Sequence, residues 1–249
     1  MRAVSAIEIS PTLHVLGIPI HDVTYDEALD HVATWIDQGD PHQIATVNPE
    51  FVMTARRDPA FRAVLDQADL CLADGVGITL AARYMGRPLR ERVAGVDLVK
   101  RLAGRAAQAG WRLFLLGAAP GVAERAADVL RQRSPGVTIC GTYAGSPAPE
   151  EAAEIAARVR AAQTDVLLVA YGAPGQDLWI ARHLPSTGAA VGVGIGGAFD
   201  YLAGVTRRAP RWIRRLGFEW LYRLVQQPWR WRRQLALPHF ALLVLLRRP

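Results

Sequence analysis

The stretch TDVLLVAYGAPGQDLWIARHL, residues 164–184, runs from an apolar strand through a glycine turn into a helix. Residues 111–130, WRLFLLGAAPGVAERAADVL, follow the same pattern. Apolar strands that alternate with helices indicate a mainly parallel sheet with helices on both faces. We therefore predict an α/β fold with a Rossmann-like sheet, in which residues at the carboxyl ends of the strands line the ligand crevice.

The segments on either side extend this alternation. Thr24 and Glu27 are spaced as a capping box, which predicts the start of a helix. Asn48-Pro49 and Asp58-Pro59 each pair an N-cap residue with a proline suited to a first helical turn. Further strands are expected in QIATVN (43–48), DLCLADG (69–75), VTICGTYAG (137–145) and GAAVGVGIGGAFDYLAG (188–204).

Charge is distributed unevenly along the chain. The 249 residues carry a net charge of +6, yet residues 205–249 hold eleven arginines and one acid, which makes this segment +10 and residues 1–204 −4. We predict an α/β domain over residues 1–204. Residues 205–249 are expected to form a C-terminal helical appendage that is basic and rich in aromatic residues.

The cysteines and the apolar segments bear on where the protein works. Cys71 and Cys140 are too few for a disulfide framework and lack the paired spacing of a zinc site, so a reducing cytoplasm is expected. The N-terminal residues do not have the pattern of a secretion signal. The apolar run at 235–246 would span about 18 Å as a helix, short of a hydrocarbon core of roughly 30 Å.

Several common catalytic motifs are missing. The sequence has no G-x-S-x-G turn, H-E-x-x-H motif, P-loop lysine or Asp-x-Asp pair, so no metal site is predicted. The glycines of residues 192–197 match a dinucleotide fingerprint imperfectly, because the last glycine comes one place early and no ribose-binding acid follows. No cofactor is predicted.

Polar residues follow the predicted strands instead. Asp74 comes after an apolar strand, where partial loss of water would raise its pKa and suit it to general-base chemistry. The alternative is that Asp74 caps the next helix. Thr46 and Asn48 end another strand and could bind sugar hydroxyls, although Asn48 also fits a plain helix cap.

Other polar residues have a ligand-binding and a structural interpretation. Gln176 could present its amide to a ligand beside helical N–H groups that favour phosphate, or it could be a surface residue. Asp200 could accept from a ribose or a base, or cap a helix. An arginine group after Asp74 could neutralise a diphosphate leaving group, or could be solvated: Arg83, Arg87, Arg90 and Arg92.

Helical phase separates basic from aromatic residues in the appendage. On a continuous helix, Arg223, Arg230 and Arg233 would share one face. A second line, spaced i, i+4, is apolar: Trp212, Leu216 and Trp220. Arginine with interfacial tryptophan fits an anionic membrane, whereas nucleic acid would leave the terminal apolar run without a partner. The alternative is packing on the domain or in a homo-oligomer interface.

Eight ordered blocks resemble the WecG/TagA/CpsF family of bacterial glycosyltransferases: TVNPEF, ADLCLADGVGI, RVAGVDL, FLLGAAPGV, YGAPGQDLWI, GVGIGGAFDYLAG, RRAPRW and FEWLYRLVQQPWRWRR. The resemblance implies a metal-independent, inverting transfer of a hexose, typically N-acetylmannosamine, from a UDP-sugar. The implied acceptor is the 4-hydroxyl of undecaprenyl-diphosphate-linked N-acetylglucosamine, in wall or surface polymer synthesis. The protein is then expected to be cytoplasmic and peripheral, at the inner face of the cell membrane.

By motif, the resemblance implies that Asp74 is the catalytic base and that Thr46 and Asn48 are active-site polar residues. Arg92 and Gln176 look like donor or diphosphate ligands. Near the nucleotide it places two residues, Asp200 and Tyr143. Three arginines match a basic segment that helps to close the site: Arg223, Arg230 and Arg233.

One departure from the family pattern concerns the donor loop, where Gly175-Gln176-Asp177 stands in place of the usual Lys-Gln-Glu. UDP-glucose or another hexose donor is therefore an alternative. A nucleic-acid-binding or scaffold protein that acts through its Arg and Trp residues is the alternative from another functional class.

Overall fold

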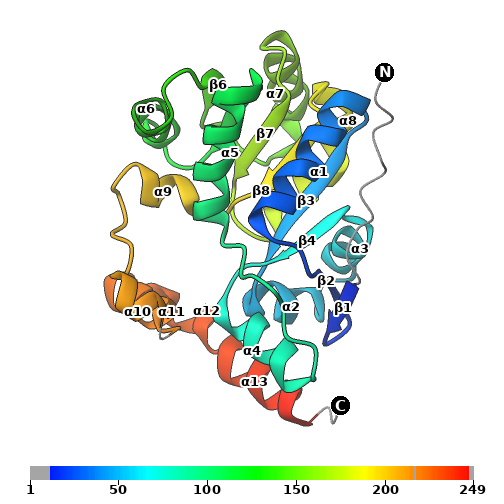
Figure 1. The fold of residues 1–249 in the computed structure, drawn as a ribbon, viewed down its shortest axis with the longest axis vertical. Helices are drawn as coiled ribbons and strands as arrows, with labels where there is room; N and C mark the ends of the chain where they lie inside the picture. The colour runs from blue at the N-terminus through cyan, green and yellow to red at the C-terminus, as the bar shows by residue number, and fades with distance from the viewer. Residues whose placement is uncertain (1–11, 216, 247–249) are drawn as a thin grey trace.

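The computed structural model of the protein describes residues 12–215 and 217–246. Six strands form one sheet in the order β4-β3-β8-β7-β5-β6, and every neighbouring pair is parallel (Figure 1). The strands are β3 (His42–Val47), β4 (Leu70–Ala73), β5 (Arg112–Gly117), β6 (Thr138–Tyr143), β7 (Val166–Ala170) and β8 (Val191–Gly194). The predicted Rossmann-like α/β sheet is confirmed.

Helices cover both faces of this sheet. They are α1 (Tyr25–Gln38), α2 (Pro49–Ala55), α3 (Pro59–Gln67), α4 (Val76–Tyr84), α5 (Gly95–Ala109), α6 (Val122–Arg133), α7 (Pro149–Ala161), α8 (Gly175–Thr187) and α9 (Ala198–Leu202). Because side chains alternate along a strand, Leu113 and Leu115 of β5 pack with α1, α5, α6 and α9. Phe114 and Leu116 pack on the other face with α7 and α8. The strand β5 is therefore apolar on both sides.

The helix starts follow the signals read from the sequence. Oγ1 of Thr24 accepts from the N–H of Glu27, and Oε2 of Glu27 accepts from the N–H of Thr24, which completes the capping box. The Oδ1 atoms of Asn48 and Asp58 cap α2 and α3. These local bonds fix where the loops at the strand ends turn into helices.

A hairpin that the sequence patterns did not indicate precedes α1. Its strands, β1 (Thr12–Val15) and β2 (Ile18–His21), are antiparallel. Ile18 and Ile20 are buried in the apolar cluster beside β4. Nδ1 of His21 accepts a 2.9 Å hydrogen bond from the N–H of Cys71. The hairpin therefore protects the outer edge of the sheet, where unpaired N–H groups would otherwise face solvent.

The appendage is helical, as predicted, but it is not continuous. Its elements are α10 (Arg211–Arg215), α11 (Glu219–Gln226), the 3₁₀ turn η1 (Pro228–Arg230), α12 (Trp231–Gln234) and α13 (Ala236–Leu246). Gly217, with a φ of 81°, separates α10 from α11, and Pro228 opens a new turn after α11. The predicted single faces of arginine and tryptophan are therefore wrong; Leu216 lies outside the described residues.

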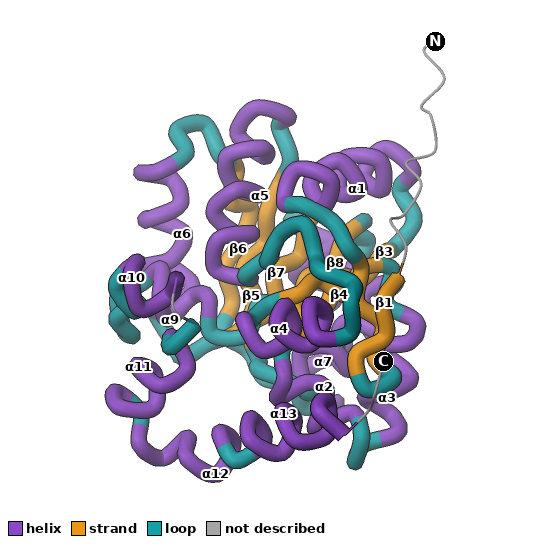
Figure 2. The backbone as a smooth tube through the Cα atoms, turned by 60° about the horizontal axis from the view of Figure 1, so that its bottom comes forward, coloured by secondary structure: helices purple, strands orange, loops and turns teal. Residues whose placement is uncertain are grey.

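The end of the appendage returns to the sheet domain. Figures 1 and 2 show it as an arc that leaves after α9 and comes back beside α2 and α4. Phe240 and Val244 of α13 are buried in the apolar cluster of these helices. The C-terminal apolar segment therefore packs on the domain, as the alternative interpretation of this segment predicted. On its other side, α13 exposes Leu242, Leu245 and Leu246. Within residues 12–215 and 217–246, no helix is both long and apolar enough to cross a bilayer.

Candidate active site

A cavity of about 610 Å³ lies at the carboxyl ends of the strands, where a parallel sheet binds its ligands. Its wall combines the loops after β3, β4, β7 and β8 with residues of the appendage. Eight of the ten predicted site residues line it: Thr46, Asn48, Asp74, Arg92, Gln176, Asp200, Arg223 and Arg233. The structure thus brings together residues from distant parts of the chain, whereas their individual roles remain predictions.

Asp74 follows β4 and is partly exposed to the cavity. It does not cap α4, because Gly75 is the N-cap of that helix, with no side-chain hydrogen bond and a φ of 128°. Instead, Oδ2 of Asp74 accepts a 3.3 Å hydrogen bond from the N–H of Gly95 at the start of α5. Burial raises the pKa of Asp74 to about 6, against the opposing effects of Gly95 and Arg92. A carboxylate with this pKa can accept a proton near neutral pH.

Thr46 and Asn48 end β3 on the same side of the cavity. The buried hydroxyl of Thr46 donates to the carbonyl oxygen of Gly194 at 2.8 Å, so it can only accept from a ligand. Asn48 is the helix cap that one interpretation expected, since its Oδ1 accepts from the N–H of Phe51 at 3.1 Å. That cap uses only the oxygen of the Asn48 amide.

Gln176 is not the surface residue that one interpretation suggested, because its side chain is fully buried. Its Oε1 accepts a 2.9 Å hydrogen bond from the N–H of Gly196. A Cβ on Gly194 would lie 2.5 Å from Oδ1 of Asp177 and 2.7 Å from Nε2 of Gln176. A Cβ on Gly192 would lie 2.7 Å from Ile180. These glycines of the imperfect fingerprint therefore allow α8 to approach β8 closely.

Asp177 is a buried carboxyl that the sequence patterns did not single out. Among the described residues, neither carboxylate oxygen of Asp177 has a hydrogen-bond partner. Nε2 of Gln176 also has none. Burial raises the pKa of Asp177 to about 7, although the neighbouring Gln176 amide acts in the opposite direction. Only its place next to Gln176 at a strand-end turn could have drawn attention to it.

The appendage supplies the opposite wall. A Cβ on Gly197 would lie 2.7 Å from Nη2 of Arg223 and 3.3 Å from Oδ2 of Asp200. The guanidinium of Arg223 therefore packs against the glycine turn after β8, close to Asp200. It also lies 5.1 Å from the ring centre of Tyr201. Arg233 is paired with Glu50 of α2, with Nη2 2.8 Å from Oε2.

Two predicted residues are not placed in the cavity wall. Tyr143 ends β6, the outer strand, and its ring lies under the guanidinium of Arg158 at 4.3 Å. The backbone of Arg230 belongs to η1, but its side chain lies outside the described part of the structure. Of the arginine group after Asp74, only Arg92 reaches the cavity; Arg90 pairs with Asp22 and Glu27.

A second groove, of about 590 Å³, adjoins the cavity and shares Glu50, Ala173 and Arg233 with it. Its wall mixes cationic and apolar side chains, among them Arg57, Arg232, Met53 and Leu235. Across residues 12–215 and 217–246, no three His, Cys, Asp or Glu side chains gather where a metal ion could bind.

A parallel α/β sheet that presents a carboxylate of raised pKa and several arginines around one cavity is an arrangement suited to group transfer from an anionic substrate. The model of the glycosyl transferase WecG/TagA/CpsF family matches residues 13–249, and the chain belongs to this family of glycosyltransferases. This confirms the resemblance read from the eight sequence blocks.

Three curated relatives share the name N-acetylglucosaminyldiphosphoundecaprenol N-acetyl-beta-D-mannosaminyltransferase. The protein of Bacillus spizizenii is 37% identical over 212 residues, covering 85% of this chain and 82% of the relative. That of Bacillus subtilis is 34% identical over 235 residues, 94% of this chain and 90% of the relative. That of Staphylococcus aureus is 29% identical over 228 residues, with 91% and 89% covered.

Proposed function

We propose that the protein transfers N-acetylmannosamine from UDP-N-acetylmannosamine to the 4-hydroxyl of undecaprenyl-diphosphate-linked N-acetylglucosamine, with inversion and without a metal ion. The observation that carries this proposal is the placement of Asp74 in one cavity with Arg92 and Arg223. The printed names of the relatives support the choice of sugar and acceptor. UDP-glucose or another hexose donor is the alternative, because UDP-hexoses share the nucleotide and differ only in the substituents and stereochemistry of the sugar ring.

In the proposed mechanism, Asp74 takes the proton of the acceptor hydroxyl as its oxygen forms a bond to the anomeric carbon. The bond from this carbon to the phosphate oxygen breaks, and UDP leaves with the electron pair. A single displacement from the face opposite UDP inverts the anomeric centre. Arg92, Arg223 and the helix N–H groups at the strand ends would stabilise the negative charge that develops on UDP.

The second groove suits the acceptor. A polyprenyl diphosphate has a dianionic head and a long apolar chain, and the groove offers Arg57 and Arg232 next to Met53 and Leu235. Because Arg233 lines both spaces, a diphosphate bound there would place its sugar toward the cavity.

The exposed apolar side chains of the appendage support peripheral binding to the inner face of the membrane. Those outside the cavity wall include Trp212, Trp229, Trp231 and Val225. Tryptophan favours the headgroup region, and arginines are attracted to anionic lipids. The appendage is therefore proposed to lie on the lipid surface with its arginines near the diphosphate.

The test is a panel of UDP-sugars with a short-chain prenyl-diphosphate N-acetylglucosamine acceptor, with product stereochemistry read by NMR. We expect transfer from UDP-N-acetylmannosamine, an inverted anomeric centre and full activity in EDTA. Transfer from UDP-glucose alone would establish the alternative donor. Retention on polyanions with no hydrolysis or transfer of any UDP-sugar would favour the nucleic-acid-binding or scaffold class.

A further inference from the structure

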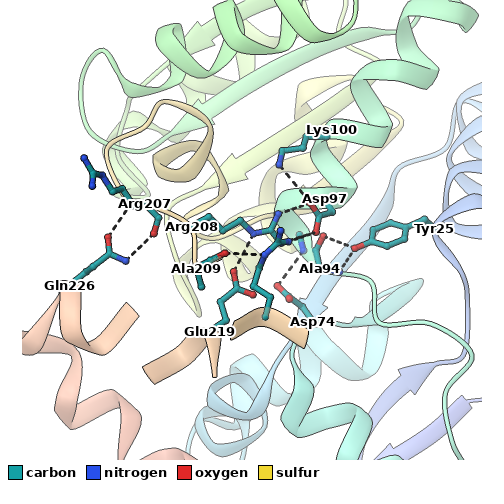
Figure 3. Close-up of polar contacts among 12 residues, drawn as sticks. Tyr25, Asp74, Ala94, Asp97, Lys100, Arg207, Arg208, Ala209, Glu219 and Gln226 are labelled. Atoms are coloured by element: carbon teal, nitrogen blue, oxygen red, sulfur yellow. Dashed lines mark hydrogen bonds and ion pairs between the residues drawn. The ribbon is translucent and has the colours of Figure 1, made fainter. Parts of the chain in front are cut away.

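Arg208 joins two helix starts that belong to different walls of the cavity. Its Nη1 and Nη2 donate to the two carboxylate oxygens of Asp97 at 2.6 and 2.7 Å, and its Nε donates to Oε1 of Glu219 at 3.2 Å (Figure 3). Asp97 lies in the first turn of α5, and Glu219 is the first residue of α11. One guanidinium thus ties the sheet domain to the appendage.

All three nitrogens of this guanidinium are engaged by protein carboxylates. The side chain of Arg208 is only 15% exposed, although it borders the cavity. Arg92 and Arg223 border the same cavity without an ion pair of this kind among the described residues. A bidentate pair with a second carboxylate on Nε is a geometry suited to holding two elements together rather than to capturing substrate.

Asp97 is stabilised in its charged form. Burial acts to raise the pKa of Asp97, but Arg208, with smaller effects from Lys100 and Arg214, lowers it below its ordinary value. Acidic groups in the first turns of α5 and α11 also face the positive ends of these helices. Asp97 therefore remains ionised at neutral pH.

Asp97 and Glu219, the two acids bound by Arg208, lie close in the chain to residues that contact Asp74 and to Arg223. Gly95, two residues before Asp97, donates its N–H to Oδ2 of Asp74. Glu219 lies four residues, about one helical turn, before Arg223, which rests on the turn at Gly197. The contact at Arg208 thus fixes the distance between the carboxylate side and the guanidinium side of the cavity.

We propose that Arg208 is a positioning residue that, with Asp97 and Glu219, holds α11 over the cavity and sets the place of Arg223. This inference rests on the proposed glycosyl transfer and adds the contact that closes its site. Charged groups face Asp74 from several elements: Arg92, Arg208 and Glu219 directly, and Glu50, Asp200, Arg223 and Arg233 across the cavity.

The first experiment measures hydrogen exchange of α11 in the full chain. Arg208→Gln should speed exchange of the α11 amides, while the core strands β3 and β8 keep the protection of the unaltered protein. The matched control is Arg131→Gln, which removes an exposed arginine paired with Asp128 on α6. Equal α11 exchange in Arg208→Gln and the unaltered protein would overturn the proposal.

The second experiment separates positioning from a general loss of structure. Arg208→Gln and Asp97→Asn should each lower kcat/KM for the acceptor about tenfold, and the double variant should lose little more than the worse single variant. Arg223→Gln should cost less in the Arg208→Gln background than alone. Additive losses in both cycles would show that Arg208 does not act through Asp97 or Arg223.

The pH profile gives a readout that unfolding would not move. Loss of a positive charge in Arg208→Gln should shift the acidic limb of kcat/KM to higher pH, and loss of a negative charge in Glu219→Gln should shift it to lower pH. If the acidic limb of kcat/KM shifted in neither variant, the proposed contact of Arg208 with Glu219 beside Asp74 would be contradicted. If no donor is transferred by the unaltered protein, the proposed function fails, and hydrogen exchange still decides the role of Arg208.

Discussion

The two walls of the cavity are held in different ways. On the sheet side, the polar groups bond to the backbone: Thr46 to Gly194, Gln176 to Gly196 and Asp74 to Gly95. On the appendage side, Arg208 and Arg233 form ion pairs with carboxylates of the sheet domain, and α11 has no buried residue. The first wall is therefore fixed by the fold, whereas the second depends on charge and responds to ionic strength.

The largest expected effect is on the sheet side. Asp74→Asn keeps the size of the side chain but removes the proton acceptor, so turnover should fall by about 10²- to 10⁴-fold while UDP binding is retained. In the unaltered enzyme, kcat should rise with pH through about 6, because Asp74 must be deprotonated. The control is Asp128→Asn, which changes an exposed acid on α6. If Asp74→Asn turned over substrate at a rate within a few-fold of this control, the assignment of Asp74 as the base would be refuted.

A smaller effect is expected on the appendage side. Arg223→Gln removes a cation beside Gly197 and Asp200, and kcat/KM should fall by about 10- to 100-fold. The loss should be accompanied by a weaker dependence of the rate on salt than in the unaltered enzyme. Measurements of initial rate over a range of KCl test this. An unchanged salt dependence would mean that the second wall does not act through charge.

The buried carboxyl behind the sheet wall should affect stability. The pKa of Asp177 is raised to about 7, so the folded state holds this proton more tightly than the unfolded state. Stability should therefore fall as pH rises from about 4 to about 7. Asp177→Asn cannot ionise, and at pH 8 we expect it to be more stable than the unaltered protein by about 1–3 kcal/mol, with a smaller gain at pH 5.

Thermal unfolding at the two pH values measures this difference, with Asp128→Asn as the control for loss of an exposed acid. A gain of Asp177→Asn that is the same at pH 5 and pH 8 would show that Asp177 does not titrate with a raised pKa.

The smallest effect is expected at the exposed tryptophans of the appendage, which are proposed to contact lipid. Trp229 is 72% exposed, so Trp229→Ala should leave the fold and the rate with a soluble acceptor unchanged. Binding to anionic liposomes should weaken by a few-fold, and salt should weaken it further. Liposome sedimentation measures both, and Leu80→Ala, at an exposed position on α4, is the matched control. Equal loss in the two variants would place the membrane contact elsewhere.

The sheet could be predicted because its signals are local. A strand, a glycine turn and a helix occur within about twenty residues at 111–130 and at 164–184, and parallel pairing of β3 with β4 brings Thr46, Asn48 and Asp74 to one edge. The contacts of the second wall have no such signal. Asp97 and Arg208 are 111 residues apart, and many other arginines of the chain are equally plausible partners.

Two expectations failed because they depended on packing that the sequence does not display: the single faces of the appendage, and the surface alternative for Gln176. A helical period was assumed across Gly217, whose conformation depends on packing against α4. Gln176 is buried because glycines on β8 admit α8, and that approach is set by the sheet rather than by the helix sequence.

Gly217 leaves no room for a larger residue. A Cβ there would lie 2.9 Å from Cγ1 of Val76, the residue that begins α4 just after Asp74 and Gly75, and the φ of 81° already disfavours any side chain. The bend of the appendage at Gly217 therefore packs against the start of α4, two residues after the proposed base Asp74. An appendage grafted onto this domain from a related enzyme is therefore expected to fit only if it has a glycine at the position of Gly217 or if Val76 is exchanged with it.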